Sequence, residues 1–598
     1  MSLKDILTPL TAWKYVTEEP VTVKDPLNDR PGAERYRGFH QNDIDECIGC
    51  GTCEEICPNA AIDLVPVDGI ETKEGDSGLR PRIDYGRCCW CGFCVDICTT
   101  KSLKLSNEYK WISENADDYR FIPGVDKKPW DKEEKGWKKP EGNFELYGQE
   151  RVKMEELHPE ERDKSFIEFV KGYSKEQAEK EADRCVECGL CVASCPAHMG
   201  IPAYIAAIRN DDLDEGLRIL YETNPLPEIC GRICTHNCET ACSVGHDGDP
   251  LSIRWLKRYI ADQNPAENYK DILNTGIIED TGKKIGIIGA GPAGLSAAYY
   301  LALMGYNCTI YEKLPKAGGM MRYGIPEYRL PYDQIDKDVD YILSLGVNIK
   351  YNVNIGEDYS IDKLGEDYDA VFAGTGLHLG RSTRIPGSDH ENVYFATDLL
   401  REISLEKEIH LSEKIIVIGG GNVAMDITRS LARLQNKKYA KVDVLATSLE
   451  SEDIMPADRE EVVEAREEKA IIDPGWGPKE IEIKDGKVVG LHVVKCLSVF
   501  DEEGKFNPKF DENNKKFFEA DMIVESIGQG MDLDYISEDI KSKLEFGPRG
   551  RIKVDSYFQS SVKWLFVGGD IIQGPDVIHG IANGHKAAVG IDNFLLGK

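Results

Sequence analysis

The second half of the chain consists of short apolar runs that alternate with glycine-rich turns and longer helical stretches. Runs such as KKIGIIG and KIIVIGG are β-rich and only a few residues long. Strands that alternate with helices in this way predict a doubly wound α/β fold with parallel sheets. The stretch 285–305 has the length of a membrane span, but its glycines predict a strand, a turn and a helix instead.

The first half has a different pattern, in which helical stretches lead into and out of cysteine runs. Residues 166–185 and 201–224 are predicted to be helical, and so is the stretch 252–263. Residues 107–165 are rich in Trp, Lys and Glu and show little periodicity, so we expect an ordered wrap or linker there.

Charge excludes several classes of partner. The 598 residues carry a formal charge of −32, with 105 acidic against 73 basic side chains. Such a surface repels nucleic acid and anionic membranes. The first residues lack the basic and apolar regions of a secretory signal, so we expect a cytoplasmic protein without membrane insertion.

Seventeen of the 19 cysteines lie before residue 250, which is decisive for the chemistry. Two early runs read CxxCxxCxxxC, a spacing in which three thiolates hold one iron–sulfur cube and the fourth cysteine ligates the other cube. Zinc sites usually present paired CxxC arms instead. Cys89, beside a ligand, is expected to be a buried thiol. The two predicted 4Fe–4S ligand sets are Cys47, Cys50, Cys53 with Cys98, and Cys88, Cys91, Cys94 with Cys57.

This region resembles the two-cluster ferredoxin-like subunit of respiratory complex I and its hydrogenase relatives. The matching stretches are RYRGFH (35–40), CIGCGTCEEICPNAAI (47–62) and IDYGRCCWCGFCVDIC (83–98). The resemblance covers roughly residues 30–125, and it implies an electron wire rather than a catalytic site.

A second group of eight thiols follows. The stretch ICGRICTHNCETAC (229–242) has a cysteine at every fourth position, which would form a stripe on one face of an unbroken helix. A glycine follows the first of these cysteines, and the residues Thr, His and Asn after the second favour helix poorly, so one continuous helix is doubtful. Eight thiols in two groups of four predict two further cubes. The groups are Cys185, Cys188, Cys191 and Cys195, and Cys230, Cys234, Cys238 and Cys242.

The stretches RCVECGLC, NPLPEICGRICTHNCETAC and IRWLKRYIAD resemble the helical iron–sulfur domain of the glutamate synthase small subunit. The same domain occurs in dihydropyrimidine dehydrogenase and in the large subunit of NADH-dependent ferredoxin:NADP transhydrogenase. The resemblance implies one cube on Cys195, Cys234, Cys238 and Cys242. It implies another on Cys185, Cys188 and Cys191 with a Gln or Glu, but Lys257 stands at that position and cannot ligate iron while charged. We hypothesise that Cys230 completes this cube.

Two glycine-rich fingerprints predict two dinucleotide sites. Gly289, Gly291 and Gly294 form GxGxxG between a strand and a helix, and Glu312 ends the next strand, where it can accept from ribose hydroxyls. The segment AGGMMRYGIPEYRLP (317–331) matches the glutamate-synthase-like flavoproteins, which implies FAD at this site and a contact from Gly319. The resemblance also implies that Asp570 contacts the cofactor and that a helix from Val577 points at it.

The second fingerprint, GxGxxA at Gly419, Gly421 and Ala424, predicts a nicotinamide dinucleotide with Asn422 and Val423 at the helix start. NADPH-specific relatives carry two Arg after the next strand, whereas this chain has Thr447 and Ser448. Glu450 or Glu452 would repel a 2′-phosphate and could accept from a 2′-hydroxyl. We therefore favour NAD(H) over NADP(H).

These features together predict a multidomain iron–sulfur flavoprotein. We expect an oxidoreductase subunit that carries electrons between NAD(H) and a low-potential partner through FAD and four 4Fe–4S clusters. The hydride chemistry needs no catalytic side chain of its own, and His579 and His585 are expected to pack or hydrogen-bond. The predicted parts are an extension (1–40), a ferredoxin-like domain (41–106), a linker (107–165), a helical two-cluster domain (166–280), and an FAD domain (281–410 and 521–598) interrupted by a nicotinamide domain (411–520).

Ferredoxin, a hydrogenase, a formate or aldehyde dehydrogenase, or another subunit of a hetero-oligomeric anaerobic complex could be the partner. Electron bifurcation at the FAD is left open by the resemblance. Two alternatives are the glutamate synthase small subunit itself and a non-catalytic electron-relay scaffold. The extra cysteine domain and the missing Arg pair argue against the first alternative.

Overall fold

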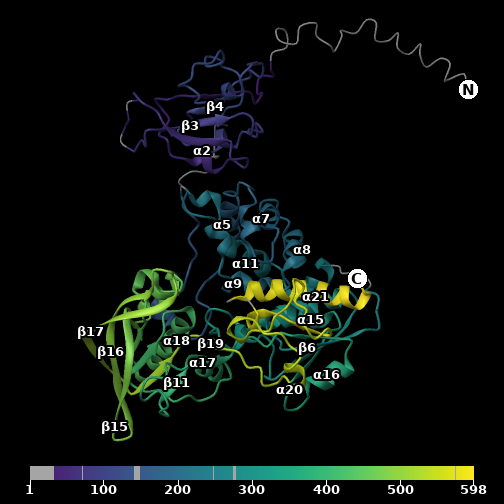
Figure 1. Cartoon of the computed structure of the whole chain (residues 1–598), viewed down its shortest axis with the longest axis vertical. Coiled ribbons are helices and arrows are strands. Elements are labelled where there is room, and N and C mark those ends of the chain that lie inside the picture. Colours follow the sequence, from purple (N-terminus) through teal and green to yellow (C-terminus); the bar gives the residue numbers. More distant parts are fainter. Residues whose placement is uncertain are drawn as a thin grey trace, which may run out of the picture. The chain divides into compact units, whose positions relative to one another are not determined.

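The computed structural model describes residues 32–70, 72–73, 75–139, 149–246, 248–273, 276, 278–572, 574 and 576–598. Most of the predicted N-terminal extension lies outside this range. The chain divides into two units, residues 1–150 with 243–250 and residues 151–242 with 251–598 (Figure 1). Each unit is described by itself, and the finer domain boundaries expected from sequence stay predictions.

The first unit is built on two small antiparallel sheets. One consists of β2 (Ile62–Pro66), β3 (Leu79–Asp84) and β5 (Arg120–Phe121), and the other pairs β1 (His40–Asn42) with β4 (Leu103–Leu105). The core is aromatic: Phe39 stacks on Trp130 with 4.4 Å between ring centroids, and Tyr85 stacks on Phe121. Trp111 and Trp130 come from the segment expected to be a wrap, so that segment covers this core.

The helical region of the second unit begins later than its periodicity suggests. Ser174 caps α5 (Lys175–Ala182) in a capping box with Gln177, and residues 166–173 are not helical. The predicted helix 201–224 is two helices, α7 (Ile201–Arg209) and α8 (Leu213–Thr223), because the chain turns at Asp211 with φ 55°. The predicted helix at 252–263 is confirmed as α11 (Ile253–Gln263).

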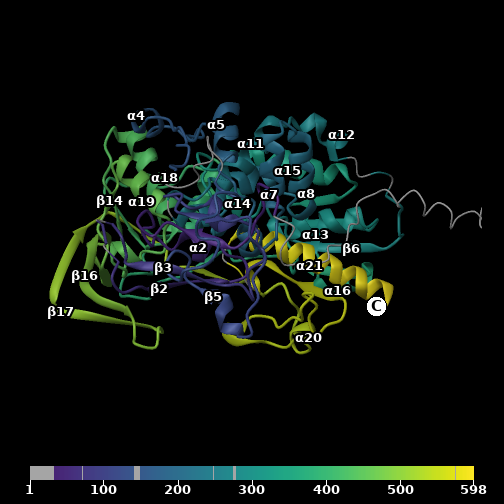
Figure 2. The same ribbon diagram turned by 90° about the horizontal axis from the view of Figure 1, so that it is seen from above.

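The first fingerprint lies in a five-stranded parallel sheet of order β20–β9–β6–β7–β8. Its strands are β6 (Lys284–Ile288), β7 (Asn307–Glu312), β8 (Asn348–Tyr351), β9 (Ala370–Ala373) and β20 (Leu565–Val567). Helices α13 (Pro292–Leu303) and α21 (Val577–Leu596) pack against each other beside it (Figure 2). The stretch 285–305 is thus a strand, a turn and a helix, as predicted. Among the described helices none is both long and apolar enough to cross a membrane.

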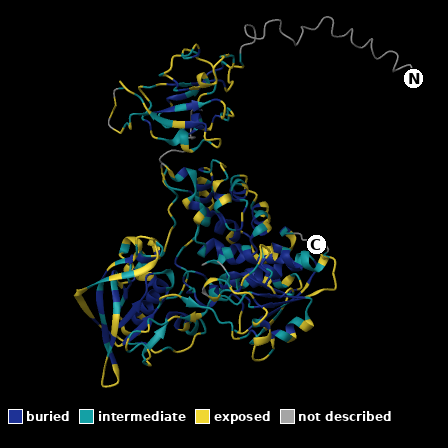
Figure 3. Cartoon of the chain, viewed as in Figure 1, coloured by how far each residue is buried: buried dark blue, intermediate teal, exposed yellow. Residues whose placement is uncertain are grey.

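The second fingerprint lies in another parallel sheet, of order β11–β18–β12–β13–β14. Its strands are β11 (Val393–Phe395), β12 (Ile415–Ile418), β13 (Val444–Thr447), β14 (Ile471–Ile472) and β18 (Met522–Glu525). Strands β11 and β18 come from outside the range 411–520. The strands β9, β12 and β18 and the edge strand β20 are wholly buried (Figure 3). An antiparallel sheet of β15 (Trp476–Lys484), β16 (Lys487–Phe500) and β17 (Phe506–Glu519) adjoins this part of the chain (Figure 1).

A buried ionic network holds the two dinucleotide regions together. Glu468 accepts from Arg429 at 2.8 Å and from Arg433 at 2.7 Å, with all three side chains inaccessible to solvent. Arg329, from the segment after the first fingerprint, pairs with Asp426 of α18 (Asn422–Tyr439) at 2.8 Å. The packing of the two regions therefore depends on several desolvated charges.

Replacing Glu468 with alanine is expected to destabilise the second unit by about 3 kcal/mol, because it leaves buried guanidinium groups underpaired. Glu467→Ala is the matched control, since Glu467 is 42% exposed in its pair with Arg162 and should change stability by less than about 1 kcal/mol. Thermal unfolding of the holoprotein measures both, and equal shifts for the two variants would contradict the expectation.

Candidate functional site

Three of the cysteine runs share one local conformation. Gly51, Gly92 and Gly189 each have φ between 79° and 89° and each precede a one-turn helix, namely α2 (Thr52–Glu55), α3 (Phe93–Asp96) and α6 (Leu190–Ser194). Only glycine adopts this left-handed conformation without strain. The third run therefore folds like the two ferredoxin-like runs, although no twin run follows it at the same spacing.

In the first unit the eight expected ligands line two cavities. Cys47, Cys50, Cys53 and Cys98 line one of them. Cys57, Cys88, Cys91 and Cys94 line the other, together with His40. Each run thus sends its fourth cysteine to the other cavity, which is the arrangement expected from the spacing.

Backbone N–H groups point at these sulfur atoms. Ala61 N–H donates to the Cys57 thiol at 3.2 Å, and Trp90 N–H donates to the Cys88 thiol at 3.4 Å. Burial raises the pKa of the Cys88 thiol to about 11, so the thiolate needs a positive partner such as iron. Cys89 is exposed rather than buried, and it lines the same cavity as Cys88 and Cys91.

The helical region also has two thiol groups, but the partition differs from the one that the resemblance implied. Burial and the neighbouring thiols of Cys185, Cys188 and Cys242 raise the pKa of Cys191 to about 12. Cys242 therefore belongs beside the first three cysteines of the earlier run. The reason is packing: α6 lies against α10 (Asn237–Thr240). Each of these one-turn helices carries one cysteine, Cys191 or Cys238, and a further cysteine, Cys195 or Cys242, follows its C-terminal end.

The other group consists of Cys195, Cys234 and Cys238, with Cys230 and Lys257 beside them. Burial raises the pKa of the Cys238 thiol, whose neighbours include Lys257, Cys234 and Cys195. Burial lowers the pKa of Lys257, but the thiols of Cys234, Cys230 and Cys238 outweigh it and raise the pKa above its ordinary value. Lys257 and Cys234 are among the groups that shift the pKa of Cys230, whereas Cys185, Cys188 and Cys191 are not, so the hypothesis that Cys230 joins those three stays a prediction without support from these contacts.

Helix packing explains this position of Cys230. It lies fully buried in α9 (Pro227–Ile233), which packs on α11. A side chain on the next residue, Gly231, would lie 2.8 Å from Arg258 Cα, so the two helices touch at their backbones. Cys234 then ends α9, and His236 has φ 41°, which confirms that the four cysteines at every fourth position do not share one helix.

The first fingerprint forms a cradle in which glycine is required at two facing positions. A Cβ on Gly294 would lie 2.0 Å from Gly289 O, and a Cβ on Gly319 would lie 2.8 Å from Gly291 Cα. Glu312, at the end of β7, accepts from the backbone N–H groups of Ala290 and Leu314. These contacts fit a pyrophosphate at the turn and a ribose near the carboxylate, as FAD requires.

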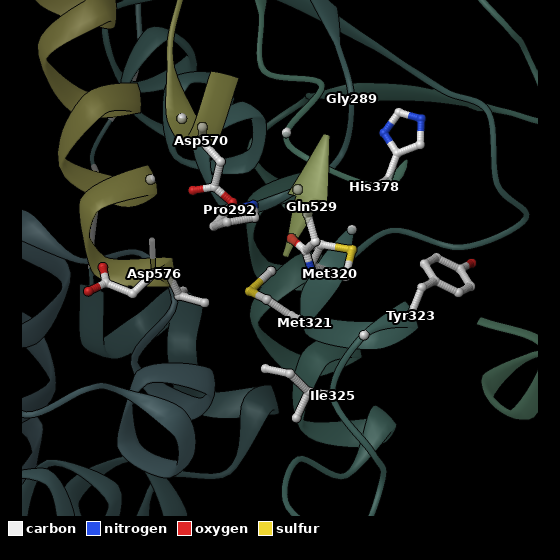
Figure 4. A pocket seen from close by; sticks show the side chains of 18 of the residues that line it. Gly289, Pro292, Met320, Met321, Tyr323, Ile325, His378, Gln529, Asp570 and Asp576 are labelled. Carbon is white, nitrogen blue, oxygen red and sulfur yellow. The ribbon is translucent and has the colours of Figure 1, made fainter. Parts of the chain in front are cut away.

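One cavity of about 270 Å³ joins the parts of this site (Figure 4). It is lined by the first fingerprint and by Asn422 and Val423 at the start of α18. Ile233 and Thr235, on either side of Cys234, line it too. Both glycine-rich helix starts and the two residues that flank Cys234 therefore meet at a single cavity.

Asp570 and Asp576 lie on one side of this cavity, opposite Met320 and Met321 (Figure 4). Burial and the charge of Asp576 raise the pKa of Asp570 to about 6. Asp576 caps α21, which begins at Val577, by accepting from His579 N–H, and it also accepts from the Thr235 hydroxyl at 3.0 Å. Sequence reasoning missed this cap, although an Asp just before an apolar helix is a standard start signal.

The second fingerprint has its own acidic neighbour. A Cβ on Gly420 would lie 2.9 Å from the Ser448 side chain and 3.1 Å from a carboxylate oxygen of Glu450. Gly419 has φ 154° and its missing side chain would meet Ser526 O at 2.3 Å, whereas Gly421 faces open space. The carboxylate of Glu450 thus lies at the turn where a dinucleotide would bind.

Comparisons with known proteins agree with this division. Residues 46–102 match the 4Fe-4S dicluster domain, residues 162–269 match the 4Fe-4S cluster domain II of dihydropyrimidine dehydrogenase, and residues 283–588 match the pyridine nucleotide-disulphide oxidoreductase family.

Three curated relatives show how far the similarity extends. The chain is 38% identical to the NADP(+)-dependent formate dehydrogenase subunit beta of Moorella thermoacetica over 68% of this chain and 60% of the relative. It is 34% identical to the NADPH-Fe(3+) oxidoreductase subunit beta of Geobacter sulfurreducens over 68% of this chain and 63% of the relative. It is 32% identical to the glutamate synthase (NADPH) small chain of Escherichia coli over 72% of this chain and 94% of the relative.

The alignments thus span less than two thirds of the first two relatives but nearly the whole of the third. The family match covers both fingerprints, the cradle and the cavity between them. The chain therefore belongs to the pyridine nucleotide-disulphide oxidoreductase family, and it also carries 4Fe-4S domains.

Proposed function

We propose that this chain transfers electrons between NAD(H) and a low-potential redox partner by way of FAD and four 4Fe–4S clusters. The cavity shared by both fingerprints and by the residues beside Cys234 carries the proposal. Bound FAD would supply the exchange of a two-electron hydride for single electrons. The chain's own residues hold the two dinucleotides at one cavity and set a thiol group beside it.

We propose four ligand sets. Two of them are the quartets that line separate cavities in the first unit. The third is Cys185, Cys188, Cys191 and Cys242, which the shared electrostatic neighbourhood supports. The fourth is Cys195, Cys234 and Cys238, completed by Cys230, with the Lys257 ammonium offsetting the negative charge of the thiolates.

Replacing Cys230 with serine is expected to weaken or remove one of the four clusters, because Cys230 is the remaining buried thiol beside this set. The iron content should fall by up to one cluster, and one EPR signal should change. Cys496→Ser is a matched control, since Cys496 is also buried but lies in β16. A variant of Cys230 with full iron content and unchanged spectra would show that the fourth ligand lies elsewhere.

NAD(H) is the proposed dinucleotide, although all three relatives named above carry NADP in their names. The support is the carboxylate of Glu450 at the turn of the second fingerprint. A 2′-phosphate beside it would meet a negative charge, whereas a 2′-hydroxyl could donate to it. Thr447 and Ser448, which replace the Arg pair, are buried and carry no charge to hold a phosphate.

We propose that the partner is another subunit of a redox complex, with ferredoxin as a further candidate acceptor. Two relatives are named as beta subunits and one as a small chain, which supports a multisubunit assembly. The clustered CxxCxxC runs need reduced thiols, which favours the cytoplasm. The glutamate synthase small subunit stays the second candidate function, because that alignment spans 94% of the relative.

Anaerobic stopped-flow mixing of the holoprotein with NADH or NADPH tests the proposal. NADH should bleach the flavin within a turnover, and reduced iron–sulfur signals should follow by EPR. Bleaching without cluster reduction would contradict the electron path. The absence of bleaching with both dinucleotides would favour a non-catalytic relay, and addition of a glutamate synthase large subunit with glutamine and 2-oxoglutarate would test the second candidate.

A further inference from the structure

The motif RYRGFH precedes the first cysteine run, and the electron path proposed above gives it no task. Its His40 is 1% exposed and lies in β1, where Trp130 donates to the His40 carbonyl oxygen at 3.3 Å. The His40 ring lines the cavity of Cys57, Cys88, Cys91 and Cys94. A buried imidazole thus faces one of the four proposed clusters directly.

The imidazole has two close partners. His40 Nε2 lies 3.2 Å from Cys94 Sγ, and His40 Nδ1 lies 2.9 Å from the Tyr85 hydroxyl oxygen. The backbone N–H of His40 also donates to this hydroxyl, at 2.9 Å. Since the hydroxyl already accepts one hydrogen bond, its own proton is free to point at Nδ1.

The proton positions follow from this set of contacts. A cysteine thiolate that binds iron has no proton and only accepts hydrogen bonds, so Nε2 must carry the proton at the Cys94 contact. Nδ1 then accepts from Tyr85, and every polar atom in the chain of contacts is satisfied. Tyr85 therefore fixes the tautomer of His40 that donates to sulfur.

Another residue of the same motif supports the same cluster site. Arg37 donates to Cys91 O at 2.7 Å and lies over the Trp137 ring at 4.6 Å. The Trp137 indole in turn donates to Asp96 at 2.7 Å, on the helix α3 that carries Cys94. Gly38 lets the chain pass close to Glu108, since a Cβ there would lie 2.2 Å from Glu108 O.

The other quartet of the first unit has no imidazole donor among the described contacts. Its thiols meet hydroxyl groups instead: Cys50 Sγ lies 3.3 Å from Thr52 Oγ1, and Cys98 Sγ lies 3.5 Å from Ser102 Oγ. A hydrogen bond to a ligating sulfur draws off negative charge and stabilises the reduced cluster, which raises its potential. The two quartets therefore differ in their electrostatic surroundings.

We propose that His40 is a positioning residue that donates a tautomer-fixed hydrogen bond to Cys94 and thereby raises the reduction potential of the cluster on Cys57, Cys88, Cys91 and Cys94. Residues of the motif RYRGFH then contact the ligands of that cluster from behind. The inference rests on the proposed function insofar as it requires a cluster on this quartet.

EPR-monitored redox titration of the holoprotein tests the inference, with the cluster on Cys47, Cys50, Cys53 and Cys98 as the internal reference. His40→Leu, which removes the donor, should lower the potential of the affected cluster so that the ratio of reduced to oxidised cluster at a fixed potential falls about tenfold, equivalent to about 59 mV for one electron. His40→Gln retains an N–H donor and should stay close to wild type. Tyr85→Phe should shift the potential less than His40→Leu and in the same direction.

An unchanged potential in His40→Leu, or an equal shift in His40→Gln, would overturn the inference. If His40→Leu does not assemble the cluster, Tyr85→Phe decides: a downward shift supports the role and no shift refutes it. Iron analysis of the unsubstituted protein separates the two levels of proposal. A protein without this cluster refutes the proposed ligand set, whereas an intact cluster with an unchanged potential refutes only the role of His40.

Discussion

Cys234→Ala is expected to separate reduction of the flavin from reduction of the clusters. NADH should still reduce bound FAD at close to the wild-type rate, because the side chains that line the cavity are unchanged. Electron delivery to an acceptor that draws from the clusters should fall by about 100-fold or more, since loss of a ligand exceeds the 10- to 100-fold effect of losing a residue behind one.

The reason lies in the position of Cys234 between Ile233 and Thr235, both of which line the dinucleotide cavity. The Thr235 hydroxyl donates to Asp576, and Asp576 caps the helix that begins beside the same cavity. The residues on both sides of Cys234 thus line the flavin site. On the proposed path, a cluster held by Cys234 would be the first acceptor after the flavin.

Stopped-flow absorbance and freeze-quenched EPR measure the two steps separately. Cys308→Ala is the matched control, because it removes a buried thiol from β7 in the flavin-binding sheet without touching a cysteine run. That variant should keep all cluster signals. Full cluster reduction in Cys234→Ala at the wild-type rate would contradict both the ligand assignment and the path.

Local spacing predicted the elements that depend on neighbours in sequence. Short motifs whose backbone geometry is fixed by residue type predicted the glycine turns at Gly289 and Gly419. The same kind of motif predicted that Cys57 and Cys98 each lie in the cavity of the other cysteine run. The sequence alone was therefore sufficient to predict the fold class. The match to three family descriptions confirms it.

Tertiary packing decided what spacing could not. Cys242 joins Cys185, Cys188 and Cys191 because α10 packs on α6, and a repeat of four residues contains no information about that contact. The predicted helix begins too early because the helical periodicity continues before Ser174. In the structure, the capping box of Ser174 fixes the start of α5 at Lys175. His40 lies 54 residues from Cys94 in sequence, so no local motif could pair them.

The second large expected effect concerns the choice between NADH and NADPH, and it depends on the charge of Glu450. Glu450→Gln is expected to narrow the preference for NADH over NADPH by about tenfold or more, because a hydrogen bond to a charged group contributes about 1.5 to 3 kcal/mol and 1.4 kcal/mol is a factor of ten. The substitution removes the acceptor charge for the 2′-hydroxyl and the repulsion of the 2′-phosphate together. The ratio of kcat/KM for the two dinucleotides measures it.

Glu452→Gln is the matched control. Glu452 lies two residues further on, but its carboxylate engages Arg466 at 2.7 Å rather than the glycine turn. It should leave the ratio within about twofold of wild type, since an exposed ion pair contributes only about 0 to 1 kcal/mol. Ser448→Arg in the Glu450→Gln background should move the preference further toward NADPH, because a guanidinium would then lie beside the turn with no carboxylate to neutralise it. An unchanged ratio in Glu450→Gln would mean that the ribose binds away from this carboxylate. If the wild-type protein prefers NADPH, the assignment of NAD(H) is wrong, and this chain uses the dinucleotide that the names of the three relatives give.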